Sequence, residues 1–157
     1  MKTVNSLPKK SEDKLKERII KTFKNINRPD ERIIDKHGLS KFGLDLILLK
    51  KDPFGFLRAY GIQLKTGDIK CSGKPTNRLK EIIGQISIAF GKKVRIDRKD
   101  YNLDGFYVIT DGYFVGQSED YIASACVGIR NLHFIDGSAL NEFFAKNEPT
   151  IDQFKET

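Results

Sequence analysis

The stretch that decides the fold runs from Leu44 to Lys65 and reads LDLILLKKDPFGFLRAYGIQLK. Residues 44–49 form an apolar run that is too apolar for a surface helix and too short for a buried one. Residues 50–55 supply turn-forming side chains, and residues 59–65 form a second run that is rich in apolar side chains. Two such runs joined by a turn predict a β-hairpin.

The hairpin is expected to bring three polar side chains together. With the turn centred on Phe54, the numbers of paired residues sum to about 108, so Asp45 lies opposite Gln63. Lys65 is two residues from Gln63 and therefore projects from the same face, whereas a one-residue slip of the register would separate the group. The apolar neighbours are expected to point to the other face, and they are Leu44, Leu46, Ile62 and Leu64.

Apolar residues at regular spacing predict further elements on both sides of the hairpin. Helices are expected over residues 12–25, over a segment that ends at Phe90, over 118–126 and over 138–145. The expected N-caps are Ser11 for the first helix, Thr76 or Asn77 for the second and Ser138 for the last. Strands are expected over 32–34, 105–110 and 132–135. Strands that alternate with helices imply crossover connections, so we expect an α/β fold in which helices flank a central mixed β-sheet.

Length and composition favour one globular domain. The chain has 157 residues, of which 39 % are apolar, and we expect a single domain over residues 11–147, between a flexible basic lead-in (1–10) and a short tail (148–157). No apolar run is long enough to cross a bilayer, and the N-terminal residues do not resemble a secretory signal. With only two cysteines, a cytoplasmic location is the simplest expectation, with no membrane partner.

The charge is strongly polarised along the chain. The first 99 residues carry a net charge of +14 and the last 58 carry −7, which gives the overall +7. Clustered lysines and arginines favour a polyanionic partner, because they displace the counterions of phosphates; a solvated basic surface is the alternative. The candidate contacts to DNA phosphates are Lys70, Lys74, Arg78, Lys92, Lys93 and Arg95.

The three polar residues of the hairpin suit metal-assisted phosphodiester hydrolysis. Asp45 and the Gln63 carboxamide offer hard oxygen ligands of the type that Mg²⁺ accepts. Lys65 could orient the attacking water or offset the negative charge that develops on phosphorus. The alternative is structural, with a buried Asp45 paired to Lys65 and the Gln63 amide merely satisfied.

Two groups of residues resemble a known family. Gly43-Leu44-Asp45-Leu46-Ile47, followed by Tyr60-Gly61-Ile62-Gln63-Leu64-Lys65, resembles the D…(D/E/Q)xK signature of the PD-(D/E)xK nuclease superfamily, in the Gln-x-Lys form of Mrr-type restriction endonucleases. The later segments FYVITDGYF (106–114) and IDGSAL (135–140) are similar to the Mrr pattern as well. The resemblance covers roughly residues 12–145. It implies a restriction-endonuclease-like core, dependence on Mg²⁺ (or Mn²⁺ in its place) and cleavage of DNA.

The resemblance also implies further site residues. The family often places a glutamate of its first helix at the metal site, and Glu17 matches that placement, although Glu12 fits the helical period almost as well. Gln85, on the helix after the Gln-x-Lys strand, is another candidate. Two departures are visible: no proline precedes Asp45, and Gln63 stands where a carboxylate is common, which removes one negative charge from the metal site.

The main prediction is therefore a Mg²⁺-dependent DNA endonuclease in which Asp45 and Gln63 bind the metal, Lys65 assists the water and Glu17 adds a ligand. A domain that cuts both strands of a duplex would often act as a homodimer. Two other interpretations stay open: a non-catalytic DNA-binding module on the same scaffold, and an interaction protein whose basic half meets an acidic partner. The chain lacks the G-x-x-x-x-G-K-[ST], G-x-G-x-x-G and G-x-S-x-G patterns, which argues against the common nucleotide and serine-hydrolase sites.

Overall fold

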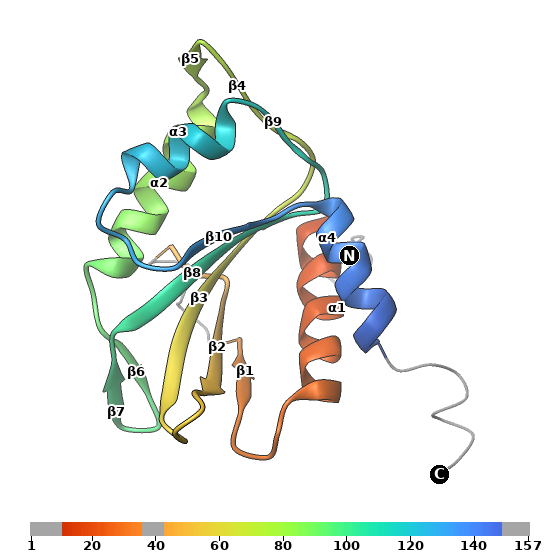
Figure 1. Ribbon diagram of the computed structural model, residues 1–157, viewed down its shortest axis with the longest axis vertical. Coiled ribbons are helices and arrows are strands. Elements are labelled where there is room, and N and C mark those ends of the chain that lie inside the picture. The colour runs from red at the N-terminus through yellow and green to blue at the C-terminus, as the bar shows by residue number, and fades with distance from the viewer. Residues whose placement is uncertain (1–10, 36–42, 149–157) are drawn as a thin grey trace, which may run out of the picture.

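The computed structural model describes residues 11–35 and 43–148, which form a central β-sheet with helices on both faces (Figure 1). The five-stranded sheet has the order β1-β2-β3-β8-β10, and two smaller sheets have the orders β5-β4-β9 and β6-β7. The helices are α1 (Ser11–Ile26), α2 (Asn77–Phe90), α3 (Ser118–Ala125) and α4 (Gly137–Asn147). The strands are β1 (Arg32–Ile34), β2 (Leu46–Lys51), β3 (Leu57–Lys65), β4 (Ile69–Ser72), β5 (Lys74–Pro75), β6 (Val94–Ile96), β7 (Lys99–Tyr101), β8 (Leu103–Thr110), β9 (Phe114–Gly116) and β10 (Leu132–Ile135).

The main sheet is mixed, as the sequence predicts. Strands β1, β2 and β3 pair antiparallel, whereas β8 pairs parallel to β3 and β10 parallel to β8. The α2 helix lies between β3 and β8 in the chain and α3 lies between β8 and β10, so these helices are the crossovers that a parallel pairing requires. The carboxyl ends of β3, β8 and β10 consequently meet at one edge of the sheet, next to the start of α1 (Figure 1).

The predicted hairpin register is confirmed. Leu46 pairs with Ile62 and Lys51 pairs with Leu57, so the residue numbers of each pair sum to 108. The turn holds this register because Asp52 Oδ1 accepts hydrogen bonds from the backbone N–H groups of Phe54 and Phe56, both at 2.9 Å. The two lysines that the sequence assigned to the turn belong to β2 instead.

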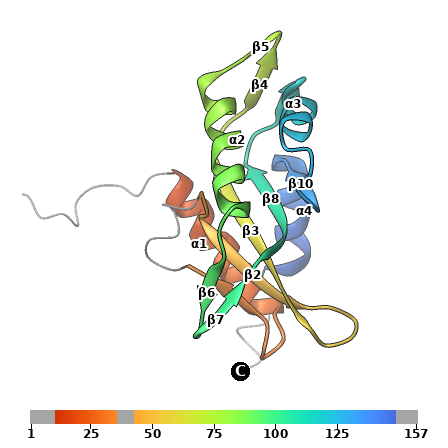
Figure 2. The same ribbon diagram turned by 90° about the vertical axis from the view of Figure 1, so that its left-hand side faces the viewer.

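Alternating residues of the hairpin serve two separate cores. Leu46, Leu48, Ile62 and Leu64 pack with apolar residues of α1 and α4, such as Ile19 and Phe144. Ile47, Leu49 and Ala59 face the other way and pack with α2 and α3, whose buried side chains include Leu79, Ile82, Ile86 and Ile122. The α2 helix runs along its face from β5 at one end to the β6–β7 hairpin at the other (Figures 1 and 2).

The prediction for Leu44 is wrong. Leu44 belongs to the core under α2 and not to the core that contains Leu46. The regular alternation breaks because β2 begins only at Leu46, and because Gly61 leaves a space over β3: a Cβ at Gly61 would lie 2.6 Å from the Leu44 side chain. Leu44 fills the space that the glycine leaves.

Other differences concern caps and short strands. The N-cap of α4 is Asp136, whose carboxylate accepts from the Ala139 N–H at 2.9 Å, and Ser138 lies inside the helix. Thr76 is the N-cap of α2, as one of the two alternatives predicted. The sequence did not predict five short strands, and these are β4, β5, β6, β7 and β9.

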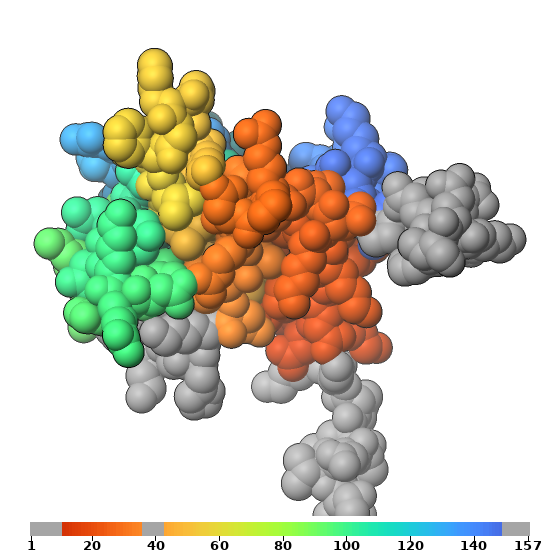
Figure 3. Space-filling view, turned by 90° about the horizontal axis from the view of Figure 1, so that it is seen from below, coloured from red at the N-terminus to blue at the C-terminus, as the bar shows by residue number. Residues whose placement is uncertain are grey.

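Figure 3 shows the end of the molecule opposite the carboxyl ends of β3 and β8. The β2–β3 turn, the β6–β7 hairpin and the segment before β1 lie side by side there, and Arg32 forms an ion pair with Asp97 of the β6–β7 turn. In the part of the chain that the structure describes, no helix is long and apolar enough to cross a membrane.

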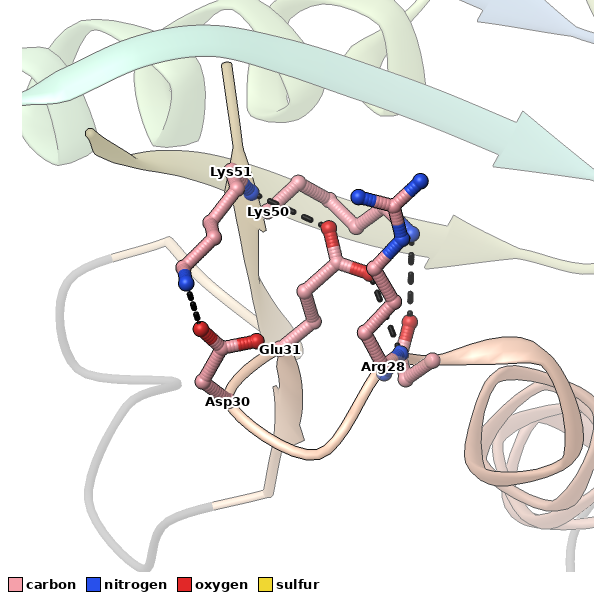
Figure 4. Close-up of polar contacts among 6 residues, drawn as sticks. Arg28, Asp30, Glu31, Lys50 and Lys51 are labelled. Carbon is pink, nitrogen blue, oxygen red and sulfur yellow. Dashed lines mark hydrogen bonds and ion pairs between the residues drawn. The ribbon is translucent and has the colours of Figure 1, made fainter. Parts of the chain in front are cut away.

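A buried glutamate joins the end of α1 to the sheet at this end (Figure 4). Glu31 accepts hydrogen bonds from the backbone N–H groups of Arg28 (3.1 Å) and Lys51 (3.0 Å), and from Lys50 Nζ (3.0 Å). Burial by itself raises the pKa of the Glu31 carboxyl, but these donors outweigh it and hold the pKa at about 2, below the usual 4.5. The charged carboxylate therefore stabilises the fold.

We expect Glu31→Gln to lower the free energy of unfolding at pH 7 by about 1–3 kcal/mol, because the amide cannot accept all three hydrogen bonds. Since the pKa is lowered on folding, the carboxylate contributes fully above about pH 4.5, and its contribution is lost as the pH falls toward 2. The pH dependence of unfolding in that window should be weaker in the variant. Denaturant unfolding between pH 2 and 7 measures both effects.

The matched control is Glu148→Gln, which removes the carboxylate of a more exposed ion pair with Arg18. This substitution should change the free energy of unfolding by less than about 1 kcal/mol. Equal losses in the two variants would contradict the structural role assigned to Glu31.

Candidate functional site at the ends of β2 and β3

The candidate site lies where the β2–β3 ladder stops. Asp45 directly precedes β2, and Gln63 and Lys65 lie at the carboxyl end of β3. The Asp45 N–H donates to the Ile62 carbonyl at 2.9 Å, and Asp45 Oδ2 accepts from the Leu64 N–H at 2.7 Å. In a longer β2–β3 ladder, a backbone carbonyl of β2 would accept this hydrogen bond from Leu64. Here the Asp45 carboxylate accepts it, and the carboxylate therefore lies against the backbone of β3 between Gln63 and Lys65.

The Asp45 carboxylate is poorly hydrated. Burial raises the pKa of Asp45 above its usual value, although the Leu64 N–H and the positive charges of Lys65 and Lys16 act in the opposite direction. The charged form of a carboxylate in this position is stabilised by an additional positive charge nearby, because water solvates the carboxylate incompletely.

The glycine before this segment holds it against α2. Gly43 has a φ of +74°, and a Cβ there would lie 2.2 Å from the carbonyl oxygen of Gln85. Both facts exclude a side chain at this position. The backbone that carries Asp45 therefore approaches α2 directly, at the helical turn that also contacts Gln63.

Gln63 is a buried polar residue with one unsatisfied atom. Its side chain is 1 % exposed, and its Nε2 donates a hydrogen bond to Gln85 Oε1. Its Oε1 has no hydrogen-bond partner among the described residues. An unpaired buried acceptor is costly, and such an atom in a native protein is often explained by an ion, a water or a ligand.

Lys65 shares the α2 face with Gln63, as the sequence predicts. Lys65 Nζ lies 3.7 Å from Glu81 Oε1, and the lysine side chain is 13 % exposed whereas that of Glu81 is 59 % exposed. The ammonium group is therefore held at the edge of the sheet while its partner is largely in solvent. The sequence analysis did not identify Glu81. The four-residue spacing between Glu81 and Gln85, which places both side chains on one side of α2, is the feature that could have indicated it.

The structure brings Glu12 of α1 to this group. Burial raises the pKa of Glu12, the Asp45 charge raises it further, and Lys65 and Arg78 lower it. Glu17 is exposed and lies about 140° further around the helix than Glu12, on the side away from the buried Leu15 and Ile19. Glu12, the alternative to Glu17 that the sequence left open, therefore lies within electrostatic reach of Asp45.

The end of β8 and the segments that follow β8 and β10 hold the loop after Lys65. The buried Thr110 hydroxyl donates to the Gly67 carbonyl, and the Gly67 N–H donates to Asp111 Oδ1 at 2.7 Å. The Gly137 N–H donates to the Gly112 carbonyl at 2.6 Å. The segments 106–114 and 135–140 thus tie together the ends of β3, β8 and β10, which keeps Lys65 in place.

The six predicted phosphate contacts do not form one surface. Lys70, Lys74 and Arg78 belong to β4, β5 and the start of α2, near the candidate site. The Arg78 guanidinium donates to the Thr66 carbonyl and, at 3.4 Å, to the Asp68 carbonyl, so it holds the loop after Lys65. The other group follows the end of α2, about 20 Å away by the length of the helix, and contains Lys92, Lys93 and Arg95.

The donor set is suited to a hard divalent cation with few protein ligands. The site offers three oxygen ligands: the carboxylates of Asp45 and Glu12, and Gln63 Oε1, which has no partner among the described residues. The described ranges 11–35 and 43–148 contain no group of three or more His, Cys, Asp and Glu side chains arranged to hold a metal. Mg²⁺ is often bound by one or two carboxylates together with water and phosphate oxygens, so these residues fit Mg²⁺ better than Zn²⁺.

Comparison of the chain with protein-family models, curated proteins and solved structures gives no match.

Paired substitutions on one helix test the placement of Glu12. Glu12→Gln should weaken Mg²⁺ or Mn²⁺ binding about tenfold or more, because it removes a charged oxygen beside Asp45. Glu17→Gln changes the same helix by the same chemistry on its exposed side and should leave the affinity unchanged. Isothermal titration calorimetry measures both, and a stronger loss in Glu17→Gln would place the first-helix ligand on the other side of α1.

Proposed function

We propose that the protein is a metal-dependent DNA endonuclease that hydrolyses phosphodiester bonds. The observation that carries the proposal is the meeting of three groups at one edge of the sheet: the poorly hydrated Asp45 carboxylate, the Lys65 ammonium, and the buried oxygen of Gln63, which no described residue pairs. Such a combination in the part of a sheet where strands end is more typical of a reactive site than of a structural one.

Each residue has a distinct task in this proposal. Asp45 and Gln63 would hold Mg²⁺, or Mn²⁺ in its place, and Glu12 would add a second carboxylate. The bound ion would polarise the scissile phosphate and lower the pKa of a water molecule. Lys65 would orient the attacking water and offset the negative charge that grows on the phosphate oxygens as the P–O bond to the leaving oxygen breaks.

The proposal extends to the family, the partners and the location. The mixed sheet, with a hairpin that carries Asp45, Gln63 and Lys65, is consistent with a restriction-endonuclease-like core of the PD-(D/E)xK type. DNA is the proposed substrate, a homodimer is the proposed form for cutting both strands of a duplex, and the cytoplasm is the proposed location.

A specific observation favours a second candidate function, a non-catalytic DNA-binding module. Gln63 supplies no charge, and the Lys65 ammonium already has the Glu81 carboxylate as a partner at 3.7 Å. A site with these features could keep the fold and the basic surface without binding a metal tightly. Salt-sensitive DNA binding without metal-dependent cleavage is the result that this alternative predicts.

Substitution of Asp45 and Lys65 tests the proposed catalysis. Asp45→Asn should abolish metal binding and cleavage together, because it removes the most buried carboxylate of the site. Lys65→Ala should leave DNA affinity nearly unchanged while cleavage falls about 10²-fold or more. The assay is plasmid cleavage with Mg²⁺, Mn²⁺ or EDTA, run beside DNA binding by fluorescence anisotropy.

The control is Lys21→Ala, which removes an exposed lysine on the solvent side of α1. It should cut DNA as fast as the parent protein. If Lys65→Ala is folded and also cuts at the parent rate, the nuclease proposal fails.

The two basic groups permit a test of how DNA lies on the protein. We expect DNA to run beside α2, since the distance of about 20 Å between the groups corresponds to about six base pairs. Two double variants test this arrangement: Lys70→Ala with Lys74→Ala, and Lys92→Ala with Lys93→Ala. Each should flatten the dependence of the logarithm of the DNA-binding constant on log salt by about 0.9 for every phosphate that the protein ceases to neutralise. An unchanged slope in the second pair would confine DNA to the end of α2 that lies near Lys65.

A further inference from the structure

A chain of hydrogen bonds connects the site to the exposed surface of α2. Gln63 Nε2 donates to Gln85 Oε1, and Gln85 Nε2 donates to Glu81 Oε1 at 3.3 Å. The same Glu81 oxygen lies 3.7 Å from Lys65 Nζ. Glu81 and Gln85 are one helical turn apart, so α2 presents both to the end of β3.

The chemistry of Glu81 gives this chain of hydrogen bonds a direction. An ionised carboxylate can only accept hydrogen bonds, so Gln85 must turn its NH₂ group to Glu81. Gln85 Oε1 is then the atom that remains for Gln63, and an oxygen of this kind can only accept. Gln63 must therefore donate its own NH₂ group, which leaves Gln63 Oε1 as the end of the amide that α2 does not use.

We propose that Glu81 is a positioning residue that sets, through Gln85, which end of the Gln63 amide is available to a cation at Asp45. The inference rests on the proposed function only for the identity of the ligand, because the orientation of the amide is a property of the free protein. If the Gln63 amide could adopt both orientations, its NH₂ group would face the cation in part of the molecules. An NH₂ group cannot coordinate a cation.

The direction of the hydrogen bonds also accounts for glutamine at position 63. Gln63→Glu would place a carboxylate against Gln85 Oε1, so two acceptors would meet. Gln85 could rotate its amide to donate to the new carboxylate, but its oxygen would then face Glu81. One unfavourable contact remains in either orientation, and neutralising Glu81 removes it.

A double-mutant cycle tests this coupling by thermal unfolding in the absence of metal. Gln63→Glu alone should lower Tm by about 2–6 °C, whereas Gln63→Glu combined with Glu81→Gln should recover most of that loss. Glu142→Gln, on the exposed side of α4, is the control for removing one acidic side chain from a helix. Combined with Gln63→Glu, it should recover none of the lost Tm. Additive effects of the substitutions at 63 and 81 would overturn the proposal.

A third substitution distinguishes the hydrogen-bond chain from simple repulsion between two carboxylates. Gln85→Met keeps the length of the side chain but removes both of its polar groups. In this background the coupling between positions 63 and 81 should disappear if it passes through Gln85. Coupling of undiminished size would show that it acts through space, and the proposed role of Glu81 would be wrong.

Metal titration separates this inference from the proposed function. Glu81→Gln should weaken Mn²⁺ binding by about tenfold, as substitution of a residue that orients a metal ligand commonly does, and the side-chain ¹⁵N–H₂ signals of Gln63 should shift in the NMR spectrum. If the parent protein binds no Mn²⁺, the proposed function fails, yet the unfolding cycle and the Gln63 signals still report on the amide. If Mn²⁺ binds equally well to Glu81→Gln and the Gln63 signals do not move, the inference fails while the metal site stands.

Discussion

The rest of the structure depends on the antiparallel pairing of β2 with β3 in a single register. The Asp52 turn sets that register, and the alternation of side chains along it divides the apolar residues between the core under α1 and α4 and the core under α2 and α3. Strand β3 then pairs parallel with β8, which fixes the far half of the sheet. A slip of one residue would exchange the two faces and turn Gln63 and Lys65 away from α2.

The candidate site exists because this ladder ends early. At Leu46 the backbone of β2 stops pairing regularly, and the Asp45 side chain supplies the acceptor for Leu64 that the strand no longer provides. The carboxylate is thereby held in a poorly hydrated position, next to a buried amide whose oxygen has no partner among the described residues. Features of this kind reduce stability, and their presence together at one edge is the basis of the proposed function.

The positive charges near the site divide between structure and binding. Arg78 holds the loop that follows Lys65 through two backbone carbonyls, and Lys65 itself lies near Glu81. Lys70 and Lys74 are exposed on the small sheet beside them. The basic stretch of sequence therefore contains residues that maintain the shape of the site, such as Arg78, as well as exposed residues, such as Lys70 and Lys74.

The sequence by itself determined the hairpin, its register, the four helices and the shared face of Gln63 and Lys65, because each follows from the spacing of residues that are close in the chain. Tertiary structure alone decided that Leu44 turns toward α2, that Glu12 approaches Asp45, and that the basic residues form two groups. It also decided the hydrogen bonds that run from Gln63 through Gln85 to Glu81. These features depend on how α1 and α2 are placed against the sheet, and that placement follows from packing between segments far apart in the chain, which periodicity does not report.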